Sequence, residues 1–433
     1  MSAVKSKNRV RRRTRVGLLA VGVMAALSFG ALNVGTAAAA PLCTGSNITG
    51  QGASLQKIAQ QNVWGPAFGS KICNKGTEPK ITYNSTGSGA GLVEWNHDGS
   101  KGSINTSLSY IGTDDAPTAA QITNIKSVAG GAQLAVIPVA QTAIALFANP
   151  PAGCEVEILT NSNLAGIMEG RITNWSKVEG TEGAGCNSPI TRVVRKDASG
   201  TTYQFKNYLF KLFSKGLSCT TGSTEGKASW AEMEPIGTGG KPNIDWPETC
   251  PEKTLSTVLR PAGTGGGQVV QTVNNTDGAI GYAALPDAKA NANANTVILA
   301  LQNNGQKKAA EANFADPAAG TVANCTAVSY QVPKLGSNND LDWSQVFGAK
   351  PAVGGESYPL CTLTYVLAFK GYKAAGFTEG QEITARDYLY EYVVQKAGQE
   401  DITSNYYAPV PTSAESLFDV LGAAQRAAKT ISY

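Results

Sequence analysis

The sequence predicts an α/β fold with two lobes, and three observations lead to this prediction. Strand-like apolar runs alternate with helix-like amphipathic runs along most of the chain, which is typical of largely parallel sheets with helices on both faces. About 390 residues remain after a predicted leader, more than one compact core usually holds. Three glycine-bearing loops lie where a strand-like run ends and a helix-like run begins.

The first forty residues read as a secretory signal. Seven basic residues precede an apolar run over 16–32, and the alanines at 37–40 offer a cleavage site before Pro41. The run contains glycines and a serine and ends without a charged stop, which argues against a membrane anchor. Leu42 lies immediately before Cys43, where a lipidated cysteine usually has a small residue. The protein is therefore predicted to be exported to the periplasm, the cell surface or the medium, without a lipid anchor.

The exported part is weakly acidic. The leader carries seven of the 36 basic residues and none of the 32 acidic ones, which leaves 29 basic against 32 acidic residues and a net charge near −3. A nucleic-acid partner is excluded on this ground, because phosphate-backbone binding needs a basic stripe. Any anion must be bound by local geometry.

All eight cysteines lie in the exported part, where an even number indicates disulfides. Pairing of nearest neighbours would give bridges at 43–73, 154–186, 219–250 and 325–361. No CxxC motif is present and His97 is the single histidine, so neither a metal site nor another cofactor is expected. His97 lies in "EWNHDGS", a polar turn in which it is expected to be solvated. No GxSxG motif accompanies it, which disfavours a Ser-His-Asp hydrolase and favours a non-enzymatic protein.

The elements follow one another in strand and helix pairs. Strand-like runs occupy 80–86, 108–113, 131–148, 190–195 and 278–285, and helix-like runs follow at 91–96, 118–125, 159–168, 201–213 and 286–290. The long run is interrupted by Pro138, as in a strand that crosses between lobes or in a central strand that ends at a proline bulge. Polar stretches at 214–253 and 303–357 are predicted to be surface excursions bounded by disulfides.

The three glycine-bearing loops share one design. They contain Gly52, Ala53 and Ser54 in the first loop, Thr86 to Gly91 in the second, and Ser199, Gly200 and Thr201 in the third. Backbone N–H groups at a helix start, hydroxyl donors and a close-approaching glycine together suit an anion. A serine or threonine before a helix is also a common N-cap, so one such loop alone would indicate little.

Charged residues flank two of these regions. Arg195 precedes the third loop and could hold an oxyanion with two parallel hydrogen bonds, with Asp197 orienting it. Asp114 and Asp115 follow the run at 108–113, and Asp115 could instead cap a helix before Pro117. A carboxylate beside an anion site can accept a hydrogen bond from protonated phosphate, whereas sulfate has no proton to offer.

Together, the motifs "GQGASL", "YNSTGSGAG", "IGTDDAP" and "VVRKDASGTT" resemble those of the substrate-binding component of the bacterial phosphate-specific ABC uptake system. The resemblance implies a two-lobed periplasmic-binding-protein-like fold of class II, with the ligand cleft between lobes joined by crossing strands. The predicted boundaries are 1–40 for the signal, 41–138 and 279–433 for the first lobe, and 139–278 for the second lobe.

The resemblance also implies ligand-binding roles for individual residues. The phosphate-contacting set would be Ala53, Ser54, Leu55, Ser88, Asp115, Arg195, Ser199, Gly200 and Thr201, with Asp197 supporting Arg195. Two positions depart from the family pattern: Leu55 replaces an aromatic residue, and Asp114 stands where a small or hydroxyl residue is common.

The function implied is extracytoplasmic binding of inorganic phosphate by a monomer, which delivers it to a membrane permease driven by a cytoplasmic ATPase. Two alternatives remain open at this point. The protein could bind another oxyanion or a phosphorylated small molecule, with Asp115 only capping a helix. It could also be a secreted phosphatase on the same scaffold, although no base or metal site is evident beside Ser88, Ser199 or Thr201.

Overall fold

The computed structural model describes residues 41–73, 79–212, 257–303, 313–325, 330, 343, 357–415 and 419–433, which belong to one compact unit. The predicted signal, the predicted 219–250 bridge, the excursion at 214–253 and most of that at 303–357 lie outside the described residues. Within the described residues, no helix has the length and apolar character needed to span a membrane.

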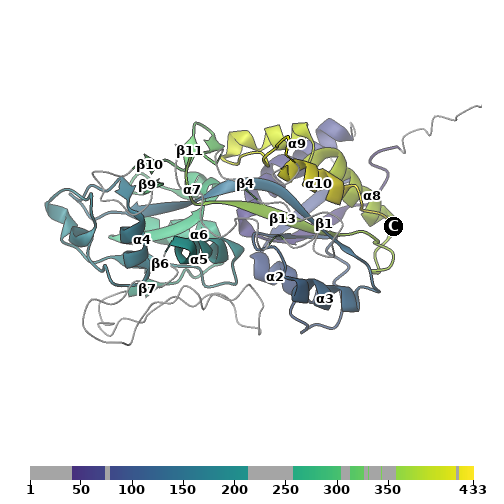
Figure 1. The fold of residues 1–433 in the computed structure, drawn as a ribbon, viewed down its shortest axis with the longest axis horizontal. Coiled ribbons are helices and arrows are strands. Elements are labelled where there is room, and N and C mark those ends of the chain that lie inside the picture. The colour runs from purple at the N-terminus through teal and green to yellow at the C-terminus, as the bar shows by residue number, and fades with distance from the viewer. Residues whose placement is uncertain are drawn as a thin grey trace, which may run out of the picture. The chain divides into compact units, whose positions relative to one another are not determined.

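One mixed sheet of eleven strands organises the unit (Figure 1). Its main path runs β2-β1-β3-β13-β4-β8-β6-β7, and β9 pairs with β4, β5 and β10 beside this path. The strands are β1 (Ile48–Gly52), β2 (Ile81–Ser85), β3 (Tyr110–Thr113), β4 (Leu134–Asn149), β5 (Ile158–Leu159), β6 (Thr191–Val193), β7 (Thr257–Leu259), β8 (Ala279–Ala284), β9 (Val297–Gln302), β10 (Phe314–Ala315) and β13 (Cys361–Phe369), with a separate pair β11 (Ala318–Ala319) and β12 (Val322–Ala323). Below, "first half" means β2, β1 and β3 with their loops and helices, and "second half" means β8, β6 and β7 with theirs.

Helices follow the strands as the alternation predicts. The α-helices are α1 (Gly65–Ala67), α2 (Ser88–Val93), α3 (Ala119–Val128), α4 (Asn161–Met168), α5 (Gly200–Leu212), α6 (Gly266–Asn274), α7 (Leu285–Asn291), α8 (Glu379–Tyr388), α9 (Lys396–Asp401) and α10 (Val420–Ala428). Short 3-10 or π-helical segments lie at Ser54–Gln56, Ala59–Trp64, Phe68–Ile72, Trp175–Lys177, Ala184–Cys186, Leu389–Val393 and Thr403–Asn405.

Strand β4 connects the two halves. Its sixteen residues are all buried, and it pairs with β13 along its first part and with β8 and β9 along its last part. The pairing with β13 shifts register where Pro138 and Ala140 face Tyr365 and Thr364. A proline lacks the N–H that a regular ladder needs, and the irregularity accommodates it. Of the two interpretations left open for Pro138, the structure therefore shows the crossing strand, with the proline at a bulge within it.

The expectation of largely parallel sheets is wrong for the middle of the sheet. β1 runs parallel to β2 and β3, and β6 runs parallel to β7 and β8. β4 and β13 instead pair antiparallel with each other and with the strands beside them. The two parallel groups thus lie on either side of the crossing strands.

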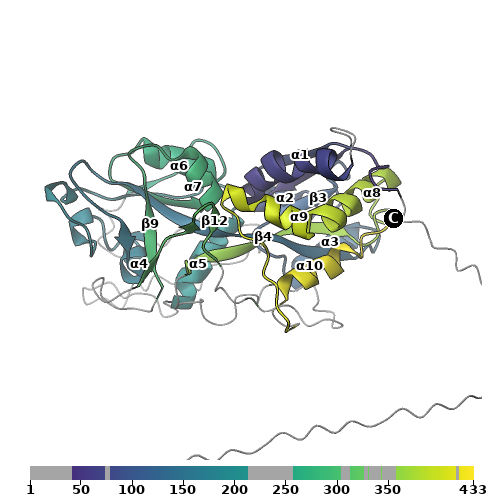
Figure 2. The same ribbon diagram turned by 90° about the horizontal axis from the view of Figure 1, so that it is seen from above.

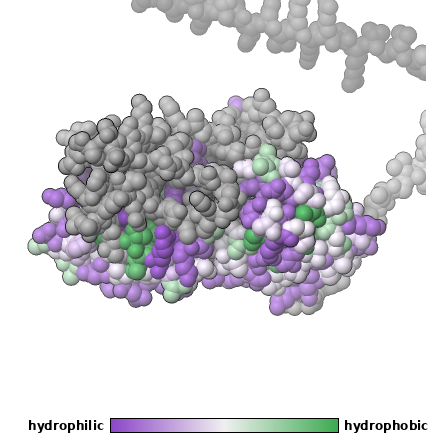
Figure 3. All heavy atoms as spheres, turned by 90° about the horizontal axis from the view of Figure 1, so that it is seen from below, coloured by the Kyte–Doolittle hydropathy of each residue, from purple (hydrophilic) through white to green (hydrophobic). Residues whose placement is uncertain are grey.

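Helices cover the sheet on both faces, as Figures 1 and 2 show together. α2 packs on β1 and β3, α10 packs on β4, and α6 packs on β8. The predicted lobe boundaries stay a prediction. Strands β8 and β9 lie in the segment 279–433, which was assigned to the first lobe, and they pair with β4, β5 and β6. On the face seen in Figure 3, hydrophilic residues dominate the described surface and hydrophobic ones are scattered among them. The strongly exposed large hydrophobic side chains of the described part are Leu42 and Tyr433.

Three of the four predicted disulfides are confirmed. Bridges join Cys43 to Cys73, Cys154 to Cys186, and Cys325 to Cys361. Each closes a loop of similar length, with sequence separations of 30, 32 and 36 residues. Loops of this size give a disulfide a stabilising effect of roughly 3 to 4 kcal/mol by restricting the unfolded chain.

Candidate functional site

The first and second glycine-bearing loops are joined by backbone hydrogen bonds. The carbonyl of Gly52 accepts from the amides of Thr86 and Gly87 at 3.1 and 2.8 Å. The amide of Ala53 donates to the carbonyl of Gly112 at 2.8 Å, so this amide is not free as the sequence led us to expect. These bonds hold the carboxyl ends of β1, β2 and β3 together, where ligands bind in open α/β sheets.

The third loop, from the second half, meets the second loop directly. The amide of Gly89 donates to the carbonyl of Ala198 at 3.2 Å. A side-chain carbon placed on Gly200 would lie 2.8 Å from both the Oγ of Ser88 and the Cβ of Asp114. Gly200 therefore lets the start of α5 approach the first half more closely than any other residue could.

Arg195 and Asp197 form a two-point ion pair at this junction. The Nε of Arg195 donates to Oδ1 of Asp197 at 2.7 Å, and its Nη2 contacts Oδ2. Burial by itself would lower the pKa of Arg195, which is only 2% exposed, but the hydrogen bonds and charge of Asp197 outweigh it and raise that pKa. Gly87, at φ +99°, lies over the pair, since a side-chain carbon there would be 2.6 Å from Oδ2 of Asp197. The predicted partnership of Arg195 and Asp197 is present.

Further contacts fix the start of α5. The Oγ of Ser199 accepts from the amide of Thr202 at 3.2 Å and caps the helix. The hydroxyl of Tyr282 lies 2.6 Å from the Oγ1 of Thr202 and 3.4 Å from the amide nitrogen of Arg195, which donates to it. The first amides of a helix have no partner within the helix, so those of Gly200 and Thr201 are suited to bind an oxyanion.

Asp114 is buried at the centre of this junction and does not face solvent. Its Oδ2 accepts from Oγ1 of Thr201 at 2.9 Å and its Oδ1 from Oγ1 of Thr364, on β13, at 2.8 Å. Its amide donates to Oγ of Ser88 at 3.2 Å. Burial raises the pKa of Asp114 to about 6, although the two threonine hydrogen bonds and the charge of Arg195 act to lower it. Asp114 thus links β3, α5 and β13.

Asp115 lies beside Gly200 and is 5% exposed. Its amide donates to Oγ1 of Thr113, and that hydroxyl donates back to the carbonyl of Asp115. The alternative that Asp115 caps the following helix is wrong. Thr118 caps α3 with Gln121 in a reciprocal capping box, because α3 begins two residues beyond Pro117.

The remaining predicted residues, Ala53, Ser54 and Leu55, take different positions. The side chain of Leu55 is in the hydrophobic core, and its carbonyl accepts from the hydroxyl of Tyr407. Ser54 is 4% exposed and faces Gly265, where a side-chain carbon would lie 3.4 Å from the Cβ of Ser54. The side chain of Ser54 thus faces the second half at Gly265, whereas Ala53 and Leu55 are held through their backbones.

Three contributors to the site were missed by sequence reasoning. Tyr282 and Thr364 reach it from β8 and β13. The stretch "RPAGTGGG" at 260–267 follows β7 and runs into the first turn of α6, and the amide nitrogen of Gly265 lies 3.5 Å from Oδ1 of Asp197. The signal for this fourth loop was available, because it repeats the strand, glycine loop and helix order of the other three.

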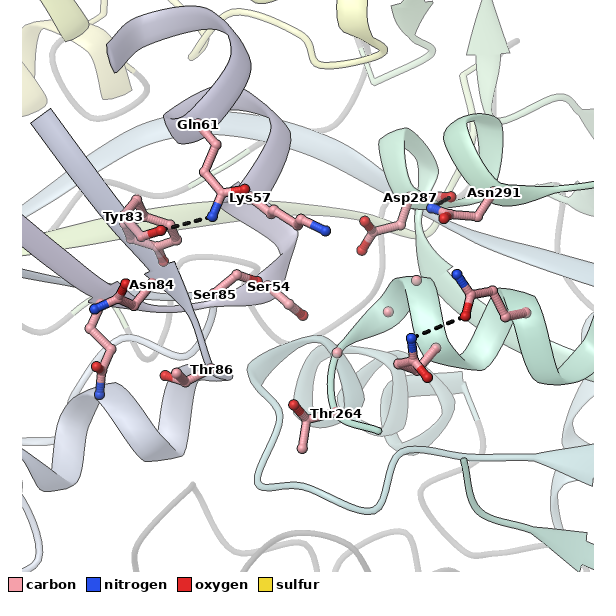
Figure 4. A pocket seen from close by; sticks show the side chains of 16 residues that line it. Ser54, Lys57, Gln61, Tyr83, Asn84, Ser85, Thr86, Thr264, Asp287 and Asn291 are labelled. Atoms are coloured by element: carbon pink, nitrogen blue, oxygen red, sulfur yellow. Dashed lines mark hydrogen bonds between the residues drawn. The ribbon is translucent and has the colours of Figure 1, made fainter. Parts of the chain in front are cut away.

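A polar cavity of about 560 Å³ adjoins these loops (Figure 4). One wall comes from the first half and the other from the second half. It is lined by Gln51, Ser54, Lys57, Gln61, Tyr83, Asn84, Ser85, Thr86, Thr264, Gly265, Gly266, Gly267, Gln268, Gln271, Asp287 and Asn291.

His97 is buried, which corrects the expectation of a solvated turn residue. It is 2% exposed, and both ring nitrogens lack hydrogen-bond partners. Its carbonyl accepts from the side chain of Asn124, which ties the turn after α2 to α3. Burial lowers the pKa of His97, which keeps the ring neutral. The amide of His97 donates to the carbonyl of Leu92, and neither Leu92 nor Asn124 belongs to the glycine-bearing loops.

The family described as PBP superfamily domain matches residues 37–395. A phosphate-binding protein PstS of Xylella fastidiosa is 26% identical over 352 residues, which cover 78% of this chain and 76% of that protein. A protein of Pseudomonas aeruginosa named alkaline phosphatase L is 24% identical over 386 residues, 83% of this chain and 88% of that protein.

The solved structure of a phosphate-binding protein from Stenotrophomonas maltophilia superposes with a TM-score of 0.61 at 18% identity, covering 88% of this chain and 93% of that one. A high-affinity periplasmic phosphate-binding protein, solved with phosphate bound, gives 0.60 at 20% identity, covering 89% and 99%. This likeness confirms the predicted α/β periplasmic-binding-protein-like fold.

Proposed function

The chain belongs to the family of the PBP superfamily domain, and from this premise we propose that it binds inorganic phosphate outside the cytoplasm and delivers it to an ABC-type importer. The observation that carries the proposal is the meeting of Arg195, the start of α5 and the loop at Ser88 across the two halves. The names of the relatives from Xylella fastidiosa and Stenotrophomonas maltophilia support it.

The site offers an anion several kinds of hydrogen bond. Arg195 supplies a positive charge already oriented by Asp197, and the first amides of α5 supply neutral donors. Ser54, Ser88 and Ser199 add hydroxyl groups beside them, whereas Thr201 contributes its amide because its hydroxyl donates to Asp114. Enclosure of the anion between the two halves would remove water and strengthen each of these interactions.

Asp115 is assigned the role of acceptor. Protonated phosphate can donate a hydrogen bond to its carboxylate, whereas sulfate would place unprotonated oxygens against a buried negative charge. Asp114 accepts hydrogen bonds from Thr201 and Thr364. The resemblance of the motif "IGTDDAP" to the family pattern assigns the acceptor role to the second carboxylate, Asp115.

Calorimetric titration of the protein from residue 41 onward tests this function. We expect one-to-one binding of phosphate and no heat with sulfate, and we expect Asp115→Asn to gain sulfate binding because the repulsive charge is gone. Asp98→Asn, a half-buried carboxylate in the turn after α2 that accepts hydrogen bonds from Ser100, serves as the control and should change neither titration. A folded protein that binds sulfate as tightly as phosphate would contradict the proposal.

We assign no hydrolytic role to the site. Oγ of Ser88 accepts from Asp114, Oγ of Ser199 caps α5, and only the hydroxyl of Thr201 donates to a carboxylate. The purified protein is expected to release no 4-nitrophenol from 4-nitrophenyl phosphate above the buffer rate. Release that Thr201→Val abolishes would instead favour the phosphatase alternative.

The proposed location and partners follow from the transport role. The protein would be exported by its predicted signal, without a lipid anchor, and act as a monomer in the periplasm, at the cell surface or in the medium. Its partners would be the permease and ATPase of the importer, and no cofactor or metal is required for binding.

A further inference from the structure

The cavity beside the Arg195 loop is much larger than an inorganic phosphate ion requires. Its volume of about 560 Å³ lies in the range of sites that hold organic ligands, roughly 300 to 1,000 Å³. No aliphatic side chain occurs among the described residues that line it. Side chains such as Asn84, Thr86 and Gln271 can donate or accept hydrogen bonds. The lining therefore suits a ligand with hydroxyl groups and not an apolar ligand.

Two opposite charges face each other across this cavity. Figure 4 shows Lys57 and Asp287 pointing toward one another from opposite walls. Asp287 is only 5% exposed, at the start of α7, with its Oδ2 packed against Gly266. Neither charged group forms a hydrogen bond or ion pair within the described part of the chain. Asp287 lines the cavity, so a hydrogen-bond donor on a ligand in the cavity would reach its carboxylate and offset the cost of its low exposure.

The cavity is continuous with the residues of the proposed anion site. Ser54 belongs to both. Thr86 lines the cavity and precedes Gly87, which lies over the Arg195–Asp197 pair. Gly265 lines it as well, and its amide nitrogen lies 3.5 Å from Asp197. A substituent on a phosphate held by Arg195 would therefore extend toward Lys57 and Asp287.

We propose that this cavity is a subsite for the alcohol part of phosphate monoesters of small polyols, so that the cleft binds such esters as well as inorganic phosphate. This inference rests on the proposed function, because the phosphoryl group would occupy the Arg195 loop. A ligand hydroxyl donates to the Asp287 carboxylate, and a second hydroxyl oxygen accepts from the Lys57 ammonium. A rival role for the two charges is an ion pair that forms when the halves close on any anion.

Titration with inorganic phosphate, glycerol 3-phosphate and methyl phosphate separates these possibilities. We expect glycerol 3-phosphate to bind one-to-one and more tightly than methyl phosphate, which lacks hydroxyl groups. Lys57→Ala and Asp287→Asn should each weaken glycerol 3-phosphate binding at least about tenfold, as expected for one lost charge-assisted hydrogen bond. Both variants should leave inorganic phosphate binding within about twofold. Lys80→Ala, an exposed lysine at the opposite end of β2, is the control and should change nothing.

The other outcomes have distinct meanings. Binding of inorganic phosphate without glycerol 3-phosphate would overturn the subsite and leave the proposed function intact. If the two variants weaken the binding of all three ligands equally, the subsite is overturned, and the two charges instead form an ion pair when the halves close. Binding of glycerol 3-phosphate without inorganic phosphate would uphold the subsite and refute the proposed function, and binding of neither by folded protein would refute both.

Discussion

Replacing Arg195 with methionine is expected to weaken phosphate binding at least about 100-fold. Arg195 is the buried cation at the junction of the two halves, and its loss also leaves Asp197 as an unpaired negative charge facing the anion. Removing one member of a buried charged contact costs about 2 to 5 kcal/mol, and each 1.4 kcal/mol is a factor of ten in affinity. Calorimetric titration with phosphate at pH 7.5 would measure the loss.

A matched control is available in the same chain. Arg171 pairs with Glu169 two residues away, as Arg195 pairs with Asp197, but it follows α4 outside the anion loops. Arg171→Met should leave phosphate affinity unchanged, and circular dichroism should show that both variants are folded. Arg195→Lys keeps the charge without the planar fork and should give an intermediate affinity. Unchanged binding by folded Arg195→Met would remove Arg195 from the site.

Replacing Asp114 with asparagine is expected to stabilise the protein at alkaline pH and not at acidic pH. Burial raises the folded-state pKa of Asp114 from its ordinary 3.8 to about 6. The stability that this group contributes is therefore complete below pH 3.8 and is lost as the pH rises through 6. The difference between the ordinary pKa and the folded-state pKa corresponds to roughly 2 to 3 kcal/mol in the free energy of unfolding, which the uncharged variant should regain at pH 8. Urea unfolding of both proteins at pH 4 and pH 8 would measure it.

The asparagine can be accommodated by the neighbouring hydroxyl groups. Its carbonyl oxygen can still accept from Thr201, and its amide can donate to Thr364, whose hydroxyl can turn to the carbonyl of Thr113 at 3.3 Å. Asp401→Asn is the control of opposite sign, since Lys71 helps to lower the pKa of that carboxylate. Greater stability of wild type at pH 8 would show that the charged form of Asp114 is the favoured one.

Local sequence signals were sufficient for much of the fold and part of the site. Glycine and hydroxyl residues between an apolar run and an amphipathic run located the loops at Gly52, Gly87 and Gly200, because backbone geometry at a helix start is encoded nearby. The Arg195–Asp197 pair was predictable for the same reason, since its members are only two positions apart. The alternation of the runs gave the order of strands and helices.

Contacts over long sequence distances could not be predicted in this way. Thr364 lies 250 residues from Asp114, and only the pairing of β13 with β3 brings them together. Residue type suggested a solvated His97, but packing of its turn against α3 buries it. The antiparallel middle of the sheet depends on two strands, β4 and β13, that run between both halves, and no local pattern specifies their direction.

A crystal structure of the protein grown with phosphate tests the central claim most directly. The account predicts one phosphate between the two halves, with its oxygens within hydrogen-bonding distance of the Arg195 guanidinium, the first amides of α5 and the Asp115 carboxylate. Phosphate bound elsewhere, for example at Lys57 alone, or a well-ordered site at Arg195 without phosphate at saturating concentration, would contradict it.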